Sequence, residues 1–557
     1  MVVGLFPNLT RHRQLHFNSW VVASLFLSLL FIGPIFAIFF AALGDSGGLW
    51  NHLFQTVLPR YVTNTILLMF GVAIFSLVFG VSSAWIVFRY SFIGRPLMQW
   101  LLLLPAAVPA YLIAYTYTDF LEYAGPVQKM LRLYFGWQSV QEYWFPEIRS
   151  MGGAMMIMGS VLYPYVYVMA RAAFFLTPAS LYEVGMLSQR NLFWTVGLPL
   201  ARPAIAAGLA LALMETISDF GTVEYFAIET LTLGIFNVWL GMNNLTAAAQ
   251  ISAFAFLFII ALLVLEKKAR ARRRFTDTTS KAVSLQPKVV SGVRAFVCFL
   301  ACSIPIIIGL LIPIIVLLGF VFQGYSLGLN KAVLDAAINS LTLAISIALL
   351  VVASAVFLGF VARFQGNKAL EKVSALASIG YAFPGTILAI GVVTAGGAID
   401  SGIYKFFYNN FGITYDGWLT SGVLLIVLAC VIRFQAIGFG AVTSGLERLS
   451  PNLMDANLVL GRGFAHGIRR VIFPLASLSL IAGGMLVFVD VMKELPMTLL
   501  LRPFNYETLP TYVYQFAKDE LLEEAAFPAL IIIATGVLPI LFMNSVLNKI
   551  TWGRSKA

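Results

Sequence analysis

Charged residues are scarce in this sequence. Of its 557 residues only 11% are Asp, Glu, Lys or Arg, and 60% are hydrophobic, whereas a soluble domain has roughly 25% charged residues. A soluble fold could not bury that much apolar surface, so the composition excludes the soluble class. The alternating strands of about ten residues that build membrane barrels are also missing. The chain is therefore predicted to be an all-α polytopic membrane protein.

Residues that form disulfides or hold metals are few as well. Cys298, Cys302 and Cys430 all lie in apolar segments without disulfide or zinc spacing, which is typical of small buried side chains. The four histidines lie in or beside predicted loops and form no ligand pattern with carboxylates or cysteines. We expect no metal site, no cofactor and no catalytic residues.

Long apolar runs are abundant and predict about twelve membrane-spanning helices, since a helix needs roughly 20 residues to cross about 30 Å of hydrocarbon. The first run is too long for the core of a cleaved signal peptide, so it is predicted to remain as a helix. The predicted spans are 19–43, 63–88, 97–119, 151–175, 200–218, 246–265, 292–320, 338–362, 372–396, 418–442, 471–490 and 526–547.

The net charge of +11 does not indicate nucleic-acid binding, because the basic residues form no stripe interleaved with exposed aromatic residues. Most of them lie in short segments between apolar runs, where they orient helices. Lys and Arg gather on one side of the predicted membrane and Asp and Glu on the other. By the positive-inside rule, both termini and the basic segment 266–290 are predicted to be cytoplasmic.

The sequence contains an internal repeat. Six spans with the same orientation on each side of segment 266–290 predict two parallel repeats, with a first half at 1–265, a basic linker at 266–290 and a second half at 291–557. One constant shift of the sequence against itself aligns five pairs of residues: Asn64 and Asn339, Pro109 and Pro384, Pro199 and Pro474, Glu215 and Asp490, and Asp219 and Glu494.

The most informative motif lies between the fourth and fifth spans of the second half. Asp455 and Ala456 are followed by Gly461 and, after an apolar segment, by Pro474. This segment resembles the E-A-A-x3-G-x9-I-x-L-P loop of the permeases of ATP-binding-cassette importers. Its glycine permits a turn and its proline punctuates the next helix, while Phe464 could enter a groove on a partner.

The first half has a weaker copy of this motif at the corresponding place. Glu183 and Gly185 mark its beginning and Pro199 its end, and it is three residues shorter between the acid and the proline. Phe193 and Trp194 are its candidate partner-binding side chains. An ordinary amphipathic connector at the membrane surface is the alternative interpretation, but two copies at matching positions favour a coupling loop.

The resemblance implies partners. Permeases of this family work with two copies of a cytoplasmic ATP-binding-cassette ATPase and with a periplasmic substrate-binding protein, in the bacterial inner membrane. The chain has no G-x4-G-K-[ST] phosphate loop, so it is not expected to be an enzyme, and ATP hydrolysis is expected on separate subunits. The lipid bilayer is its other partner, and no nucleic acid is expected.

Several further stretches are similar to the ferric-iron branch of these permeases, which implies ferric iron as substrate. Relatives with the same architecture import thiamine, sulfate, phosphonates or polyamines, so these substrates are the alternatives. The stretches are 123–128, 143–146, 162–167, 215–222 and 493–503.

Carboxylates at the end of the fifth span of each half are candidates for lining the pathway, because charges within a membrane are costly and often functional. Glu215 and Asp219 are four residues apart, as are Asp490 and Glu494, so each pair shares a helix face if the helix continues. An interfacial salt bridge with Lys493 is the alternative.

A secondary transporter with six helices in each half is the rival class. It would need ionisable residues in the middle of its helices, for which only Arg433, Glu215 and Asp490 are candidates. It would also leave the two motif-bearing loops without a purpose. The permease is therefore the favoured interpretation.

Overall fold

The computed structural model describes residues 19–187, 191–271, 285–323, 330–364, 368–378, 380–414, 417, 419–447, 449–450 and 452–555. Most of these residues are helical. The two strands in this part of the chain have two residues each, β1 (Tyr90–Ser91) and β2 (Lys288–Val289), and they pair in parallel. The prediction of an all-α polytopic membrane protein is confirmed.

Ten helices in the described ranges are long and apolar enough to cross a membrane. Helices form here because lipid offers the backbone no hydrogen-bond partners, and a helix satisfies its own. In chain order they are α1 (Ser19–Ala42), α3 (Leu58–Arg89), α7 (Met151–Leu176), Phe193–Ser218 with α9 (Leu198–Ser218), Gly292–Phe322 with α13 (Gly292–Ile306) and α14 (Ile312–Phe322), α15 (Lys331–Phe364), α17 (Gly385–Phe411), α18 (Leu424–Glu447), Ala465–Met492 with α21 (Phe473–Met492), and Leu522–Leu541 within α24 (Leu522–Ser555).

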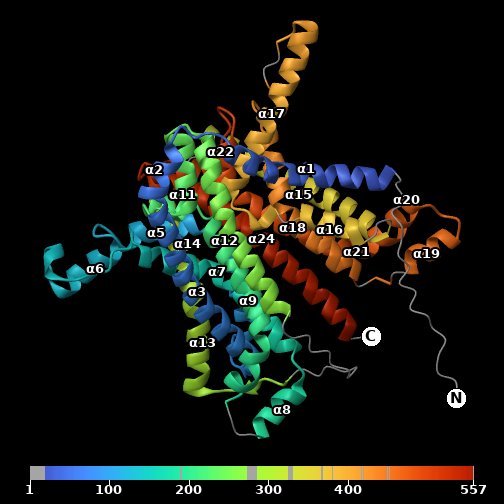
Figure 1. Ribbon diagram of the computed structural model, residues 1–557. Helices are drawn as coiled ribbons and strands as arrows, with labels where there is room; N and C mark the ends of the chain where they lie inside the picture. Colours follow the sequence, from blue (N-terminus) through green and yellow to red (C-terminus); the bar gives the residue numbers. More distant parts are fainter. Residues whose placement is uncertain are drawn as a thin grey trace, which may run out of the picture.

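Other helices lie between these ten in the chain and carry the features discussed below (Figure 1). They are α4 (Arg95–Leu101), α5 (Ala110–Leu121), α6 (Pro126–Phe135), α8 (Ala179–Leu187), α10 (Gly221–Tyr225), α12 (Leu245–Ala271), α16 (Lys368–Ala377), α19 (Asn452–Val459), α20 (Phe464–Gly467), α22 (Pro496–Leu501) and α23 (Leu509–Lys518).

The structure differs from the twelve predicted spans at three places. The third predicted span is bent by 93° between Arg95–Ala107 and Ala110–Phe135, and counting this pair as one span gives eleven. The sixth corresponds to α12, whose apolar part is short. The ninth begins later than predicted, after Pro384. Pro109 and Pro384 are both extended, with ψ of 137° and 141°, so each interrupts its helix where an apolar run continues.

Each half has a core of three helices, which are α3, α7 and α9 in the first half and α15, α18 and α21 in the second. Close approach in each core depends on a glycine at the repeat-related positions 208 and 483. A Cβ on Gly208 would lie 2.6 Å from the Tyr165 carbonyl oxygen, and one on Gly483 would lie 2.4 Å from the Ala441 Cβ. Small residues allow helices to pack closely in lipid, where van der Waals contact drives association.

Residues at corresponding positions of the repeat make the same tertiary hydrogen bonds. The Asn64 side chain donates to the Glu229 carbonyl at 3.0 Å, and the Asn339 side chain donates to the Glu507 carbonyl at 2.9 Å. The neighbouring hydroxyl in each half, from Thr65 or Ser340, accepts a backbone N–H at 3.1 or 2.7 Å. These bonds fix the second span of each half to the segment that follows the fifth.

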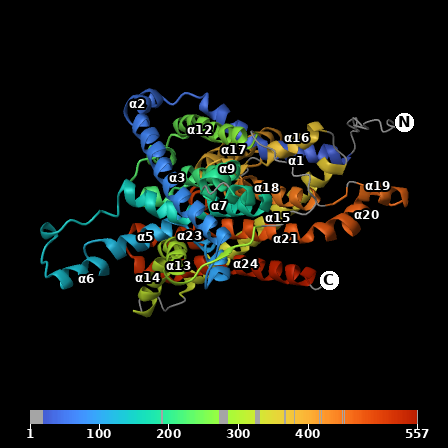
Figure 2. The same cartoon turned by 90° about the horizontal axis from the view of Figure 1, so that it is seen from below.

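The first helix of each half packs against the other half. Helix α1 contacts α15, α16 and α17, and α13 and α14 contact α3, α4 and α5. The Tyr117 hydroxyl donates to the Ile308 carbonyl at 2.9 Å across this second contact. The two sequence halves therefore interlock instead of forming separate bodies (Figures 1 and 2).

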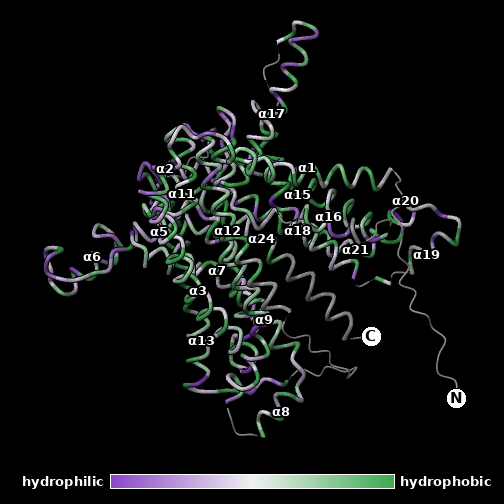
Figure 3. Tube along the Cα trace, viewed as in Figure 1, coloured by the Kyte–Doolittle hydropathy of each residue, from purple (hydrophilic) through white to green (hydrophobic). Residues whose placement is uncertain are grey.

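Two pairs of segments project from different parts of the molecule. Helix α6 and the end of α17 extend to the left and the top of Figure 1, whereas α8 lies at the bottom and α19 and α20 lie at the right. Hydrophobic residues cover much of the length of the helices between them (Figure 3). The α6 and α17 ends thus mark one side of the protein, and α8 and α19 mark the other.

Candidate functional site

The two motif-bearing segments have the same architecture. Each consists of a short helix, α8 or α19, followed by a π-helical turn at Phe193–Gly197 or Ile468–Ile472 and then a long helix. The two turns occupy corresponding positions of the repeat. Pro199 and Pro474 closely follow these π-helical turns, inside the continuous helices Phe193–Ser218 and Ala465–Met492, where a proline removes one helical hydrogen bond.

In the second copy, Asp455 and Ala456 lie on α19 and Phe464 begins α20. Between these helices, Gly461 has a φ of +70°, in the left-handed region that favours glycine. The Asn457 amide closes the turn by donating to the carbonyls of residues 462 and 463 at 3.0 and 3.2 Å. The motif glycine is therefore required by the backbone of this turn.

In the first copy, Glu183 is exposed on α8 and Gly185 is buried. A Cβ on Gly185 would lie 2.8 Å from two side chains of the following segment. The glycine therefore allows α8 to pack closely against that segment. Phe193 packs against Trp85 with ring centroids 5.2 Å apart, whereas Trp194 is 65% exposed. Trp194 is therefore exposed, whereas Phe193 packs against the rest of the protein.

The predicted acids of the first half lie where α9 ends. Glu215 is on the last turns of α9, and Asp219 is the residue after its end. One Asp219 oxygen accepts the Thr222 and Val223 backbone N–H groups at 3.0 and 3.2 Å, and the other accepts the Thr222 hydroxyl at 3.0 Å. Asp219 therefore caps α10 and stabilises the non-helical turn between α9 and α10.

The second half repeats this arrangement. The Glu494 carboxylate accepts the Met497 backbone N–H at 3.1 Å at the start of α22, and its other oxygen lies 3.0 Å from Arg433 Nη1. The Arg433 and Glu494 side chains are only 5% and 6% exposed. Asp490 lies one turn earlier on α21 and pairs with Lys493 at 2.8 Å.

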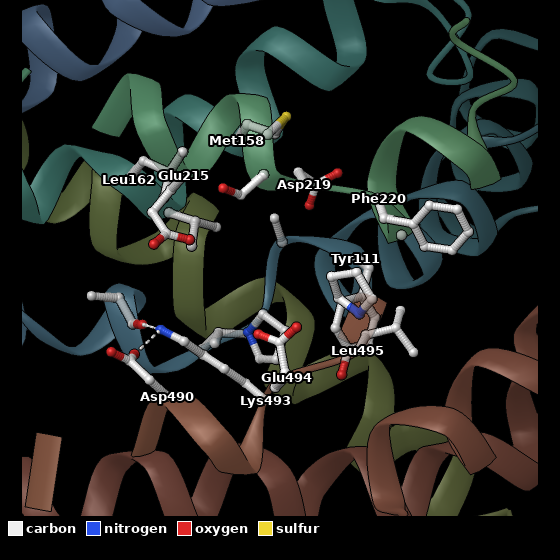
Figure 4. A pocket seen from close by; sticks show the side chains of 18 of the residues that line it. Tyr111, Met158, Leu162, Glu215, Asp219, Phe220, Asp490, Lys493, Glu494 and Leu495 are labelled. Atoms are coloured by element: carbon white, nitrogen blue, oxygen red, sulfur yellow. Dashed lines mark hydrogen bonds and ion pairs between the residues drawn. The ribbon is translucent and has the colours of Figure 1, made fainter. Parts of the chain in front are cut away.

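All four predicted acids line one cavity of about 90 Å³ (Figure 4). Both halves contribute to it, since Glu215 and Asp219 come from the end of α9 and Asp490 and Glu494 from the end of α21. The loop before α5 forms another wall of this cavity. The sequence pattern predicted two separate acid pairs, and the fold brings them together.

The charges in this cavity are distributed unequally between the halves. Arg433 neutralises Glu494, and Lys493, which also donates to the Ala106 carbonyl at 3.4 Å, neutralises Asp490. Within the described ranges, no Lys or Arg lies within 4 Å of the Glu215 or Asp219 carboxylate. With all carboxylates ionised, two negative charges in the first half have no cation as an ion-pair partner.

The acids are too dispersed to hold an ion tightly in this conformation. Among the described residues, no three Asp, Glu, His or Cys side chains form a group that could coordinate a metal. The arrangement can instead attract a cation electrostatically and let it leave, because a partly buried carboxylate acts in a medium of lower dielectric constant than water.

Aromatic side chains continue from the cavity toward the side marked by α6. Tyr111 lines the cavity, its ring lies 5.7 Å from Tyr115, and Tyr115 lies 4.5 Å from Tyr225. Arg149 stacks over Tyr225 at 4.9 Å and pairs with Glu520 of the second half at 3.1 Å. This column therefore connects the lining of the cavity with an ion pair between the two halves.

Sequence reasoning identified the acids but not their partners in the cavity. Arg433 was recognised as a charge within a span, and its pairing with Glu494, 61 residues away, follows only from the packing of α18 against the end of α21. Tyr111 was not identified, because one tyrosine in an apolar helix has no distinguishing pattern. The Asp490–Lys493 salt bridge proposed as an alternative is present, and Asp490 lines the cavity as well.

Comparison with known proteins gives similarity along almost the whole chain. No protein-family model matches it. The chain is 25% identical over 502 residues to the Fe(3+)-transport system permease protein FbpB 2 of Haemophilus influenzae, covering 88% of this chain and 91% of that protein. It is 21% identical over 575 residues to the ferric transport system permease protein FbpB of Actinobacillus pleuropneumoniae, covering 97% and 78%.

A shorter relative matches only part of the chain. The putative 2-aminoethylphosphonate transport system permease protein PhnV of Salmonella typhimurium is 21% identical over 232 residues, which cover 82% of that protein but 42% of this chain. A protein with the length of one such permease thus corresponds to less than half of the present sequence.

Proposed function

We propose that this chain is the permease subunit of an ATP-binding-cassette importer for ferric iron, and that one copy supplies both halves of the membrane pathway. The family assignment rests on similarity to ferric permeases over 88% of the chain. The observation that carries the mechanism is the convergence of four acids from two repeat-related helix ends on one cavity between the halves.

The cavity suits transient passage of a hard cation, which prefers oxygen ligands. Glu215 and Asp219 supply negative charge that no lysine or arginine neutralises at ion-pair distance in the described part of the chain. Asp490 and Glu494 hold their charges in salt bridges, so a cation would have to compete with Lys493 or Arg433 for them. Weak and shared ligation favours release, which a permease must achieve.

Helices α8 and α19 are the proposed contacts to two copies of a separate cytoplasmic ATPase. Both lie far from α6 and the end of α17 (Figure 1), and both carry exposed apolar side chains beside their motifs. In the first loop these include Leu187 and Trp194, and in the second Val459 and Leu460. Tryptophan is enriched among the residues that dominate binding at protein interfaces, so Trp194 is the proposed anchor, and the exposed aliphatic side chains add apolar contact area.

The opposite side of the molecule is then periplasmic in a multi-pass inner-membrane protein, with both termini in the cytoplasm. A periplasmic binding protein would deliver the cargo near the Arg149–Glu520 pair, which joins the two halves there. Movement of the halves driven by the ATPases would open the aromatic column below this pair and expose the cavity to the cargo.

The test is uptake of radioactive iron by proteoliposomes that contain the permease with its ATPase and binding protein. We expect Glu215→Gln to reduce uptake at least tenfold, because it removes a cavity charge without removing a backbone hydrogen bond. The matched control is Asp335→Asn, an exposed acid on α15, which should transport normally. Unchanged iron uptake by Glu215→Gln would contradict a role of this cavity in the pathway.

A phosphonate is the second candidate cargo, favoured by the similarity to PhnV. The same proteoliposomes can be offered labelled 2-aminoethylphosphonate. Uptake of this compound together with failure to take up iron would keep the permease assignment and replace the cargo.

A further inference from the structure

A second cavity, of about 410 Å³, lies where α3 ends and α13 begins. Its polar walls include three cations, Arg89 from the end of α3, Lys288 from β2 and Arg294 from the first turn of α13. None of the residues that line it is acidic. This cavity shares no lining residue with the cavity that the four acids line.

The fold builds this cavity from segments that are far apart in the sequence. Strand β2 pairs with β1 so that Lys288 lies opposite Tyr90, and the Val290 N–H donates to the Ser91 carbonyl at 3.0 Å. This pairing places Lys288 beside Arg89, the last residue of α3. Helix α13 then packs its Phe299 ring 3.5 Å from the Cβ position of Gly94, in the turn before α4.

Every charge in the described surroundings favours an anion. No Asp or Glu of the described ranges lies within 4 Å of the charged groups of Arg89, Lys288 or Arg294. The start of α13 adds to the positive potential. Ser291 is the N-cap residue, but its side chain accepts no hydrogen bond from the helix, so the first backbone N–H groups of α13 remain available to an anion. An anion with several acceptor oxygens, such as a phosphate, matches this set of donors.

The remaining walls indicate that this phosphate belongs to a lipid. Val293 and Val297 line the cavity and are 79% and 56% exposed, on a helix that is part of the apolar span Gly292–Phe322. Figure 3 shows α13 largely in the hydrophobic colour. The cations therefore lie where this span starts, at the level of lipid headgroups, and the valines continue from them toward the acyl chains. A soluble phosphate compound would gain nothing from this apolar wall.

We propose that this cavity binds the headgroup phosphate of an anionic phospholipid, with an acyl chain along Val293 and Val297. Basic pockets between membrane helices on the cytoplasmic side are suited to such headgroups. The bound lipid would bridge Arg89 of the first half to Lys288 and Arg294 on the other side of the cavity. The lipid would thereby hold the C-terminal end of the linker, which contains Lys288, against the first half at the membrane surface.

The experiment uses the purified full chain and a photoactivatable phosphatidylglycerol, with the crosslinked peptides identified by mass spectrometry. We expect crosslinks to the start of α13 and to the β1–β2 region, and displacement of the probe by unlabelled phosphatidylglycerol but not by phosphatidylcholine. Arg89→Gln, Lys288→Gln and Arg294→Gln combined should reduce the crosslinking yield at least tenfold. Lys372→Gln, an exposed lysine outside the cavity, is the matched control and should keep the full yield.

A second set of variants separates loss of binding from loss of folding. Arg89→Lys with Arg294→Lys retains the charges, so this protein should keep most of the crosslinking yield even if the triple glutamine variant is unstable. Equal labelling by phosphatidylcholine, or full yield in a folded triple variant, would overturn the proposal. Displacement of the probe by inorganic phosphate as effectively as by phosphatidylglycerol would also overturn it and would indicate a site for soluble anions.

Discussion

The buried pair Arg433–Glu494 allows a quantitative test of how the cavity is held together. We consider Glu494→Gln, which keeps the shape of the side chain and an acceptor oxygen for the Met497 N–H but removes the negative charge. The Arg433 guanidinium would then remain at 5% exposure without its counterion. Its Nε already has no hydrogen-bond partner in the described structure, so Arg433 has few other ways to compensate.

The expected cost is large because burial removes the water that would otherwise solvate the orphaned charge. Breaking a buried ion pair by removing one partner typically costs about 3–5 kcal/mol. An exposed pair of nearly the same length should behave differently. Arg149 and Glu520 are 3.1 Å apart, but their side chains are 37% and 72% exposed, and such pairs contribute about 0–1 kcal/mol.

The assay is thermal unfolding of the full chain in detergent, measured for Glu494→Gln, for Glu520→Gln and for the double variant Arg433→Met with Glu494→Gln. We expect Glu494→Gln to lower the melting temperature by several degrees and Glu520→Gln to leave it nearly unchanged. The double variant should recover much of the loss, since no unpaired charge remains. Equal melting temperatures for the two single variants would refute the reasoning, because burial would then have no energetic consequence.

Three further predictions concern the coupling turn, the repeat and the assembly. Gly461→Val should lower uptake per ATP hydrolysed in the reconstituted complex, because left-handed backbone costs a non-glycine residue about 1–2 kcal/mol. The control is Gly463→Val, which should leave this ratio unchanged because Gly463 has no positive φ. Asn64→Ala and Asn339→Ala should lower the free energy of unfolding by similar amounts, about 1–3 kcal/mol, since each leaves a carbonyl without its donor. Asn410→Ala, at an exposed side chain, should leave this free energy unchanged. Unequal losses for Asn64→Ala and Asn339→Ala would contradict the repeat. Native mass spectrometry should find one copy of this chain with two ATPase subunits, and two copies would show that each chain supplies only part of the pathway.

The sequence alone was sufficient to predict the class of fold and the positions of most helices. Hydropathy over about 20 residues reports directly on transfer into lipid, so the runs at 19–43 and 63–88 correspond closely to α1 and α3. The same argument failed at Pro109 and Pro384, because apolar residues continue through both breaks. Hydropathy measures where a segment can reside and does not report the backbone angles within it.

The repeat and its acids were also visible in the sequence, because aligning the two halves by one constant shift needs only residue identities. A spacing of four residues predicted that Glu215 and Asp219, like Asp490 and Glu494, share a helix face if the helix continues. Helices α9 and α21 end at Ser218 and Met492 instead, so Asp219 and Glu494 lie beyond their helices. Whether the four acids share one site could not be predicted, since no local rule relates the end of α9 to the end of α21.

Only the tertiary structure decided which half covers which, and what neutralises the buried acids. The crossing of α1 onto α15 and α17, the contact of Arg433 with Glu494 and the pairing of β1 with β2 all join segments that are far apart in the chain. Such contacts depend on the packing of all helices at once, because in lipid the helices associate through close van der Waals fit and not through a hydrophobic pattern that a sequence displays.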